Sequence, residues 1–448
     1  MDHLTRYQER TPRSRELQQR ARRVLPLGVE SNFRFFDPYP IYIDRAGGSR
    51  IWDVDGNEYI DYALAFGALM VGHAHPVVVR AIELQAARGL MYGMPHAPLV
   101  ELAEVLTARH GLDMIRFTNS GTEATMHALR VARGATGRDA ILKFEGAYHG
   151  AHDAVLVALK PRAGASGDAA APLSVPASKG IPPEVSALTV AATFNDLDSV
   201  RSAIARARGG VAAIIVEPVM MNIGVVEPEP GFLEGLREIC TREGALLIFD
   251  EVKTGSKLAP GGAAEYYGVK PDLVTMAKSF GGGAPIGAFG GSRAAMRAIE
   301  EFEVFHAGTY NAGPVPVAAS LAALKEVLTP DVYPHVRALN TRLIDGYNRI
   351  IAERGLEAHA TGVGANGCVY FTRRPVRNYR DFLHADAEMF WRYFFGMLNR
   401  GIIPCGQFYD EQWTVSVAHS EADIDAHLEA FAEVAVDLEM ARRATAKV

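Results

Sequence analysis

Short apolar runs that end on a charged residue recur along this chain. Residues 245–249 are continuously apolar and are followed by Asp250 and Glu251, and a second, mostly apolar run over 272–277 is followed by Lys278. Unbroken apolar runs of this length are typical of parallel strands buried on both faces of a sheet. The intervening chain is long enough for a crossover, so we predict neighbouring strands that bring Asp250 and Lys278 to one edge.

The same pattern appears earlier in the chain, beside segments with helical periodicity. Residues 140–144 and 212–216 indicate two further buried strands, and residues 114–134 indicate a strand, a turn and an amphipathic helix. This alternation predicts an α/β fold whose large domain has a mostly parallel sheet flanked by helices. Ligands of such folds bind at the carboxyl edge of the sheet.

The two ends of the chain favour a smaller α/β domain. Residues 5–25 have helical spacing and stop at Pro26, which predicts one N-terminal helix, and an Asp-Gly-Asn turn at 55–57 separates two β-rich runs. The C-terminal pattern predicts helices from about residue 315 and over 333–353, and strands over 367–371 and 414–417.

We therefore expect three segments, which are a small-domain segment over 1–75, a large domain over 76–315 and the rest of the small domain over 316–448. One stretch inside the large domain lacks any hydrophobic period. Residues 160–187 are rich in Ala, Pro, Gly and Ser, and form the longest loop of the chain. Such a loop is either a surface excursion or a lid, and we favour a mobile lid because long loops in compact domains are often functional.

Composition narrows the class of protein. With 448 residues, 48% of them hydrophobic, the chain is long enough to bury a large core. A formal net charge of −6 leaves no basic footprint for nucleic acid. No apolar run reaches membrane-spanning length and the charged N-terminus lacks a signal-peptide core, so we expect a cytoplasmic protein. The three cysteines and fourteen histidines show no metal-ligand spacing, which predicts no catalytic metal.

The acid and the lysine at the predicted sheet edge suggest one particular cofactor chemistry. Pyridoxal phosphate is held by a lysine as a Schiff base, and an aspartate keeps its pyridine nitrogen protonated so that the ring draws in electrons. Single charged residues at strand ends are more often solvated, and it is the combination of Asp250 with Lys278 that favours the functional interpretation. Upstream, Ser120-Gly121-Thr122 precedes Glu123 at a helix start, which suits either an ordinary cap or a phosphate cup.

Several motifs in this order resemble one known family. The segments FDEV (249–252), EYYGVKPDL (265–273), MAKSFGGG (276–283) and PIGAFGG (285–291) are similar to the cofactor core of the class III, fold-type I pyridoxal phosphate aminotransferases. The branch containing glutamate-1-semialdehyde 2,1-aminomutase is the most similar, and the resemblance runs from about Val24 to about His427.

The resemblance implies a role for each cofactor-site residue. Lys278 is the Schiff-base lysine and Asp250 is the partner of the ring nitrogen. Thr309 implies a homodimer, because in the family this threonine binds the phosphate of the neighbouring subunit's cofactor. The other residues implied to contact the cofactor are Ser120, Gly121, Thr122, Tyr148, His149, Glu217, Asn222 and Val252.

The resemblance also implies a substrate site, in which this chain departs from the family. Ser31 and Arg34 fall where the aminomutases bind a substrate carboxylate, and Glu411 falls where they recognise the amino group. Phe66 stands where they have a tryptophan. The chain further departs from the family's sequence at Asn32-Phe33, at Gly255-Ser256-Lys257 and at Asn311-Ala312-Gly313.

These departures lead us to expect a transaminase that moves an amino group between an amino acid and a keto acid through a Schiff base at Lys278. The aromatic residues around the predicted pocket favour an apolar or aromatic substrate, either an α- or a β-amino acid. Two alternatives stay open. One is the aminomutase itself, which moves an amino group within one molecule, and the other is a non-catalytic protein that only binds the cofactor.

Overall fold

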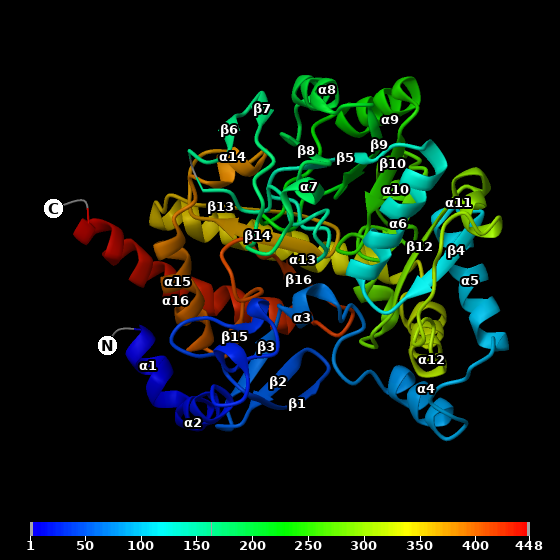
Figure 1. Ribbon diagram of the computed structural model, residues 1–448. Coiled ribbons are helices and arrows are strands. Elements are labelled where there is room, and N and C mark those ends of the chain that lie inside the picture. Colours follow the sequence, from blue (N-terminus) through cyan, green and yellow to red (C-terminus); the bar gives the residue numbers. More distant parts are fainter. Residues whose placement is uncertain (1–2, 163, 446–448) are drawn as a thin grey trace. The chain divides into compact units, whose positions relative to one another are not determined.

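The computed structural model of the protein describes residues 3–162 and 164–445, which form two compact units (Figure 1). The small unit comprises residues 1–75, 334–374 and 384–448, and the large unit comprises 76–333 and 375–383. The chain leaves the large unit at residue 333, where we expected 315. The reason is that α12 (Pro314–Ala322) packs against α4 (Pro76–Ala86) and α5 (Ala97–His110), both in the large unit.

A mixed sheet of seven strands forms the centre of the large unit as the structure describes it. Only β12 runs antiparallel to its neighbours, as expected for a mostly parallel sheet. In sheet order the strands are β4 (Met114–Thr118), β12 (Gly287–Gly291), β11 (Leu273–Met276), β10 (Leu246–Asp250), β9 (Val211–Val216), β5 (Ala140–Phe144) and β8 (Thr189–Ala192).

The two strands that carry the predicted acid and lysine are neighbours, which confirms the expected pairing. β10 and β11 run parallel, with Ile248 opposite Leu273 and Asp250 opposite Thr275. Lys278 follows two residues after the end of β11, in the short 3₁₀ helix η3 (Lys278–Gly281). Both functional groups therefore leave the sheet at its carboxyl edge.

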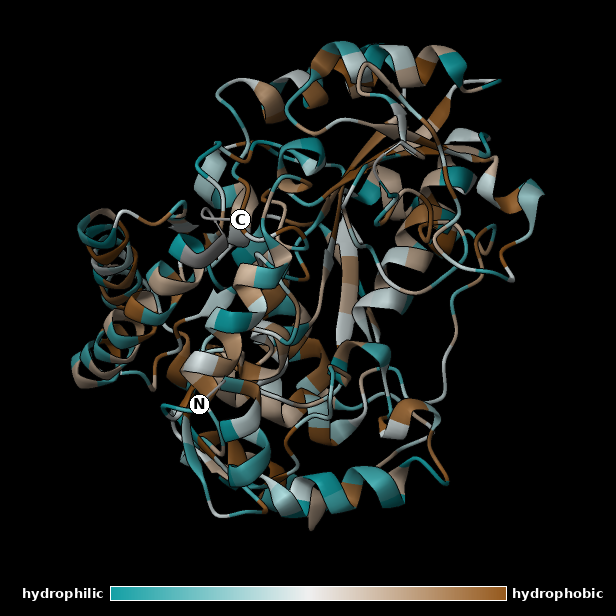
Figure 2. Cartoon of the chain, turned by 90° about the vertical axis from the view of Figure 1, so that its left-hand side faces the viewer, coloured by the Kyte–Doolittle hydropathy of each residue, from teal (hydrophilic) through white to brown (hydrophobic). Residues whose placement is uncertain are grey.

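Helices pack on this sheet through apolar faces. α6 (Gly121–Thr136) contacts β9, β11 and β12, and its buried side chains include Ala128, Leu129 and Ala132. Residues of α6 share one core cluster with residues of β9 and β10 and of α11 (Arg293–Glu300). Other helices on the sheet are α8 (Leu197–Arg206) and α9 (Phe232–Glu243). Figure 2 shows hydrophobic residues gathered on the strands, whereas the helices carry both hydrophobic and hydrophilic residues.

The glycine-rich run after Lys278 has a packing reason. Most of these glycines lie in β12 or in the turn before it. A Cβ at Gly287 would lie 2.5 Å from the Ser120 carbonyl oxygen and 2.5 Å from Thr118 Oγ1. A Cβ at Gly291 would lie 2.0 Å from the Asp272 carbonyl oxygen. The glycines therefore let β12 lie close against the segments beside it.

The small unit is built from both ends of the chain. β15 (Ile402–Ile403) pairs with β3 (Glu58–Asp61) in parallel and joins the C-terminal segment to the N-terminal meander of β1 (Ile43–Gly47), β2 (Arg50–Asp53) and β3. A second sheet contains β13 (His359–Val363), β14 (Asn366–Tyr370) and β16 (Trp413–Thr414). The longer helices of this part of the chain are α13 (Val332–Arg354), α15 (Ala387–Leu398) and α16 (Glu421–Thr445).

The N-terminal helix differs from our expectation, because it is two helices. α1 (His3–Arg10) and α2 (Pro12–Ala21) are separated at Thr11, which has φ −127° and ψ 45°. A proline disfavours helical backbone in the residue before it and lacks the N–H that would continue the helix, but it fits well at a helix start. The helical spacing of the sequence therefore continues past Pro12, although the helix itself is broken there.

The long loop over 160–187 contains short elements of its own. These are β6 (Gly167–Asp168), β7 (Ala171–Pro172) and the single-turn helix α7 (Pro183–Ser186). Thr193 Oγ1 donates to the Ala169 carbonyl at 2.7 Å, and Arg206 donates to the Pro172 carbonyl at 3.3 Å. The loop is thus attached to β8 and α8. Among the described residues of the whole chain, no helix is both long and apolar enough to cross a membrane.

Candidate active site

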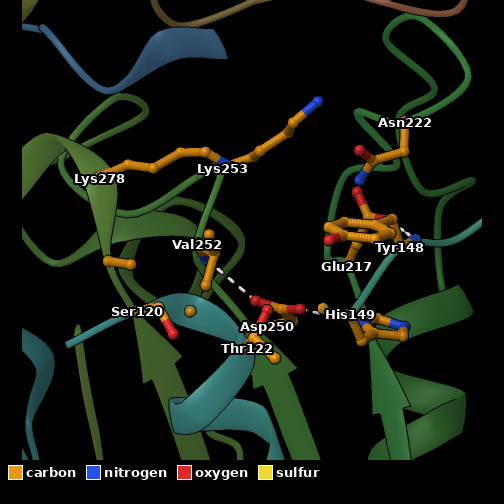
Figure 3. Close-up of a pocket in the computed structure, with 13 residues that line it drawn as sticks. Ser120, Thr122, Tyr148, His149, Glu217, Asn222, Asp250, Val252, Lys253 and Lys278 are labelled. Carbon is orange, nitrogen blue, oxygen red and sulfur yellow. Dashed lines mark hydrogen bonds and ion pairs between the residues drawn. The ribbon is translucent and has the colours of Figure 1, made fainter. Parts of the chain in front are cut away.

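A pocket in the large unit lies where the carboxyl ends of β5, β9, β10 and β11 meet the start of α6 (Figure 3). Every residue predicted to contact the cofactor lines it, apart from Thr309. The lining also contains Gly150, Lys253 and Ala277, which the sequence interpretation did not select.

Asp250 is buried and held in place by three donors. Its Oδ2 lies 2.8 Å from His149 Nδ1, and its Oδ1 accepts from the Val252 N–H at 3.1 Å and from Thr275 Oγ1 at 3.0 Å. Only 4% of Asp250 is exposed. Three donors offset the cost of burying an ionised carboxylate, so the site can hold a negative charge at this position.

His149 is the ring that faces this carboxylate, and it is buried too. Its second nitrogen, Nε2, has no hydrogen-bond partner among the described residues. Burial and the neighbouring His149 lower the pKa of His152 to about 4, which keeps that second imidazole neutral at ordinary pH.

Glu217 has a structural role in addition to the cofactor contact that the resemblance implies. Its carboxylate accepts the backbone N–H of Tyr148 at 2.8 Å and the backbone N–H of Met221 at 2.9 Å. It thereby joins the loop after β5 to the loop after β9. Tyr148 and Asn222 both lie in loops that this carboxylate fixes, and both line the pocket.

The start of α6 carries a helix cap and lines the pocket. Ser120 Oγ accepts the Glu123 N–H at 3.2 Å, and Glu123 Oε2 accepts the Asn119 N–H at 2.6 Å, which is a reciprocal capping arrangement. The first N–H groups of a helix have no partner inside it and attract anions. The cap interpretation is therefore confirmed, and the phosphate cup stays a prediction.

Two glycines keep this helix start close to its neighbours. A Cβ at Gly121 would lie 2.9 Å from Val252 Cγ2, and a Cβ at Gly150 would lie 2.7 Å from Thr122 Cα. Gly150 also has φ 103°, which side chains rarely adopt. Val252 and Tyr148 lie on opposite sides of the drawn pocket, as a flat ring between them would require (Figure 3).

Lys278 begins η3 with a strained backbone. Its φ is 55°, in the left-handed region that favours glycine, and its side chain lines the pocket. Residues held in such conformations cluster at functional sites. Lys253 is the second lysine of the lining, is 6% exposed, and donates from Nζ to the Met221 carbonyl at 2.7 Å.

Thr309 does not line this pocket. It lies exposed in a turn after residue 306. An exposed position is what a residue that acts in another subunit's site requires. None of the described residues of the loop over 160–187 lines the pocket either.

The four predicted substrate residues lie in the small unit, and the structure brings Phe66 and Glu411 together there. A Cβ at Gly406 would lie 2.8 Å from Glu411 Cγ and 3.1 Å from Phe66 Cδ1. Glu411 is buried, whereas Phe66 is half-buried with φ 60°.

Ser31 and Arg34 lie beside Phe33, in and next to the 3₁₀ helix η2 (Asn32–Arg34). The ring of Phe33 packs 6.1 Å from that of Phe66. Arg34 is exposed and forms an ion pair with Glu30 at 2.7 Å. Its guanidinium therefore already has a carboxylate partner.

Comparison with known proteins identifies the family. The model of the family "Aminotransferase class-III" matches residues 34–434. This chain belongs to the class III aminotransferases. A glutamate-1-semialdehyde 2,1-aminomutase of Methanothermobacter thermautotrophicus is 46% identical over 94% of this chain and 98% of its own length.

Solved structures agree with this membership. An omega-transaminase from Sphaerobacter thermophilus superposes with a TM-score of 0.90 at 35% identity, covering 95% of this chain and 97% of that one. A glutamate-1-semialdehyde aminomutase from Pseudomonas aeruginosa, in complex with PMP, superposes with a TM-score of 0.88 at 30% identity, covering 97% of each chain. The protein is therefore a pyridoxal phosphate-dependent enzyme of fold type I.

The residues of the pocket fit this cofactor. The open helix start with its two glycines suits a phosphate, the buried Asp250 suits a protonated ring nitrogen, and Lys278 supplies an amine on the neighbouring strand end. Among the described residues no group of three or more His, Cys, Asp or Glu side chains is placed to hold a metal ion.

Proposed function

We propose that this enzyme catalyses the glutamate-1-semialdehyde 2,1-aminomutase reaction, in which an amino group moves between adjacent carbons of one molecule. The observation that carries the proposal is the similarity to aminomutases, which are between 43% and 46% identical over 93–95% of this chain. This was the alternative of the sequence interpretation, and similarity at this level over the full length favours it above a general transaminase.

The proposed roles in the large unit follow from the geometry. When bound, pyridoxal phosphate supplies an aldehyde that takes up amino groups and a ring that draws in electrons. Lys278 is the residue that attaches the cofactor, and its Nζ moves a proton once a substrate amine has displaced it. Asp250, oriented by His149 and Thr275, holds the proton on the ring nitrogen.

The remaining residues of the pocket position the ring. Gly121 and Thr122 offer backbone N–H groups to the phosphate, and Ser120 offers its hydroxyl beside them. Tyr148 and Val252 hold the two faces of the ring, and Asn222 donates to its phenolic oxygen. Burial raises the pKa of the Tyr148 phenol, so this ring stays neutral against the cofactor.

In the small unit we propose that Ser31 and Arg34 bind the substrate carboxylate. Glu411 recognises the substrate's amino group. Arg34 pairs with Glu30 in the structure, so a substrate carboxylate has to share or replace that partner. A guanidinium can hold two carboxylates through different N–H groups, which makes sharing feasible.

A second candidate function is a transaminase for an apolar or aromatic amino acid. The observation that favours it is the aromatic cluster of Phe33, Phe66 and Phe408, in which Phe33 lies 6.1 Å from Phe66 and 6.4 Å from Phe408. Phe33 and Phe66 are two of the positions where this chain departs from the aminomutases.

One experiment separates the two candidates. The cofactor-loaded enzyme is mixed with glutamate-1-semialdehyde, with the matching diamine, and with single α- and β-amino acids of both hands, while absorbance and products are followed. Aminomutase function is expected to give the isomer whose amino group has moved from carbon 2 to carbon 1, with no external keto acid. Release of a keto acid from one class of amino acid, without isomerisation of the semialdehyde, would establish the transaminase instead.

A further inference from the structure

The turn that carries Phe66 has an unusual backbone. This turn is α3 (Leu64–Gly67), which follows β3 in the small unit (Figure 1). Leu64, Ala65 and Phe66 have φ 44°, 52° and 60°, and Gly67 has φ 75°. Left-handed backbone is costly for every residue with a side chain, and it normally occurs at single residues rather than in runs. A run of non-glycine residues in this conformation therefore stores strain at a proposed substrate contact.

The turn closes hydrogen bonds of its own. The N–H of Gly67 donates to the Ala63 carbonyl at 3.0 Å, and the N–H of Ala68 donates to the Leu64 carbonyl at 2.9 Å. Leu64 is fully buried, whereas Ala65 is exposed. The chain thus makes a complete left-handed turn that packs one side chain inward and leaves the next one outside.

Asp61 fixes the chain where it enters this turn. Its Oδ1 accepts the N–H of Ala63 at 2.9 Å and the N–H of Leu64 at 3.1 Å, and its Oδ2 lies 2.7 Å from Nε2 of His73. Only 4% of Asp61 is exposed. A buried carboxylate keeps its place when both of its oxygens have hydrogen-bond partners. The two peptide groups at which the chain becomes left-handed are therefore held by one carboxylate.

Both sides of the contact between Asp61 and His73 are anchored. The N–H of Asp61 donates to the Ser49 carbonyl at 2.8 Å. His73 exchanges backbone hydrogen bonds with Gly48 in both directions, each at 2.8 Å. Gly48 and Ser49 connect β1 to β2, so the carboxylate is held on the N-terminal sheet and can oppose the strain in the turn.

The turn brings Phe66 to residues of the proposed substrate site. The ring of Phe66 lies 6.1 Å from that of Phe33, and both Phe66 and Glu411 lie beside Gly406. The direction of a side chain follows from the backbone conformation of its residue. A right-handed turn over the same residues would therefore direct Phe66 elsewhere, away from this arrangement.

We propose that Asp61 is a positioning residue for the substrate site, because it holds the strained turn that places Phe66 beside Glu411. The inference rests on the proposed function, since it takes Phe66 to contact the substrate. Asp61 itself touches no substrate, and its carboxylate offsets the cost of the left-handed backbone. A glycine in the turn should then reduce the need for Asp61, which would not hold for a carboxylate that only stabilises the fold.

The first test measures the strain without any substrate. Glycine adopts left-handed backbone as readily as right-handed backbone, so the melting temperature of Ala65→Gly should equal or exceed that of the wild type. Ala338→Gly is the matched control, at an exposed alanine within the right-handed helix α13 of the small unit. It should lower the melting temperature by roughly 1–3 °C. An equal fall in Ala65→Gly overturns the proposal.

The second test measures substrate binding. Asp61→Ala should raise the KM for the substrate roughly tenfold and keep kcat within about threefold, because the groups that react lie in the large unit. Asp61→Asn keeps an oxygen that accepts the same backbone N–H groups, and should stay near the wild-type KM. Adding Ala65→Gly to Asp61→Ala should recover much of the lost affinity. An unchanged KM in folded Asp61→Ala, or no recovery with Ala65→Gly, overturns the proposal.

Failure of Asp61→Ala to fold also gives an answer. If Ala65→Gly restores folding to Asp61→Ala, the strain of the turn is what Asp61 opposes, as proposed. If the double variant fails to fold as well, the carboxylate serves the fold of the small unit as a whole, and the proposal is overturned.

Phe66→Ala shows whether Asp61 acts through this ring. In the Phe66→Ala background, Asp61→Ala should raise the KM further by less than about twofold, because residues that act through one another are not additive. A full tenfold rise in that background would mean that Asp61 acts by another route, which overturns the proposal.

Turnover of glutamate-1-semialdehyde by the wild type is measured first, and it tests the proposed function alone. If the wild type does not convert the semialdehyde, the proposed function fails, and KM values are compared with the amino acid that the wild type does accept. The melting temperatures of Ala65→Gly and Ala338→Gly need no substrate, so the strain in the turn is judged in either case.

Discussion

Asp250 is the residue whose environment is most specific to the proposed chemistry. Replacing it by asparagine keeps the shape of the side chain and removes the charge that holds a proton on the ring nitrogen. We expect Asp250→Asn to lower kcat by about 100-fold or more, while cofactor content stays near normal because Lys278 and the phosphate cup are unchanged. The measurement is steady-state turnover with cofactor content determined in parallel. Asp153→Asn, an exposed carboxylate in the same region, is the matched control and should leave kcat unchanged.

Most residues of the pocket could be predicted from the sequence, because they belong to motifs that end strands or begin a helix. Lys253 could not, since the alternation of buried and exposed positions after Asp250 breaks down in a buried loop. Thr275 was missed for another reason. Its contact with Asp250 follows from strand register, and register is visible only once β10 and β11 are paired.

A buried histidine of the small unit should make stability depend on pH. Burial lowers the pKa of His427 to about 3, from the ordinary value of 6.5, and its Nε2 lies 2.7 Å from the Tyr347 hydroxyl. The unfolded chain takes up a proton at this group below pH 6.5 and the folded chain does not, so stability is lost as the pH falls from 6.5 towards 3. The loss approaches about 1.4 kcal/mol per pH unit for each such group.

Thermal melting between pH 7 and pH 4 tests this expectation. The melting temperature of the wild type should fall with acidification, and His427→Gln should fall less steeply because the titrating group is gone. His384→Gln replaces an exposed histidine of the same unit and should follow the wild-type slope. An unchanged slope in His427→Gln would contradict the assignment.

At the scale of elements, the short helix α14 (Tyr379–Phe382) ties the long loop to the cofactor site. Arg380 forms two hydrogen bonds with Glu145, at 2.8 and 2.9 Å, and also donates to the Ser166 carbonyl at 2.9 Å and the Gly167 carbonyl at 3.0 Å. Tyr379 donates to the Pro161 carbonyl at 2.8 Å. Glu145 begins the loop that carries Tyr148, so one arginine holds both this loop and the proposed lid.

Arg380→Ala should therefore loosen both segments. We expect a loss of about 1.5–3 kcal/mol from the broken charged hydrogen bonds, faster proteolytic cleavage within residues 160–187, and weaker cofactor binding. Limited proteolysis and cofactor dissociation are the measurements. Arg377→Ala removes a more exposed arginine nearby, whose guanidinium pairs with Glu229 at 3.8 Å, and should behave as wild type. Equal cleavage rates in the two variants would show that Arg380 does not restrain the loop.

Elements were predictable where the hydrophobic period is uninterrupted, as in β5, β9, β10 and β11. The boundaries of helices and domains were less predictable. The period across Pro12 hid the break between α1 and α2, and the apolar pattern after residue 315 does not reveal that α12 packs on α4 and α5. Both misjudged boundaries depend on a local backbone restriction or on a distant packing partner, and neither leaves a trace in the period.

At the scale of the whole molecule, the sequence pattern does not reveal which surface pairs with a second copy, whereas the structure offers a candidate. Two segments of the large unit meet where Nε2 of His96 lies 3.1 Å from the carbonyl oxygen of Ala312. One segment contains His96 and the other contains Ala312. The exposed apolar side chains of these segments include Leu90, Met94 and Tyr310, with exposed fractions of 66%, 78% and 67%. Exposed large apolar residues that form a contiguous patch mark an interface, so this region is the candidate.

Thr309 lies in this region, exposed and outside the pocket of its own chain, so we expect a homodimer in which it reaches the partner's cofactor phosphate. Mixing two variants that are each impaired at limiting cofactor tests this. Lys278→Ala lacks the attaching lysine, and Thr309→Ala is expected to bind cofactor roughly tenfold to a hundredfold more weakly, through the loss of one hydrogen bond to a charged group.

A mixed dimer of these variants contains one intact site if Thr309 acts across the interface, because the Thr309→Ala chain supplies Lys278 and the Lys278→Ala chain supplies Thr309. Activity at limiting cofactor should then reappear on mixing under conditions that exchange subunits. If Thr309 instead serves its own chain's site, each mixed dimer holds one site without the lysine and one without the threonine, and mixing restores nothing. Light scattering of the two variants before mixing shows whether each is a dimer, so that absence of recovery is not mistaken for absence of assembly.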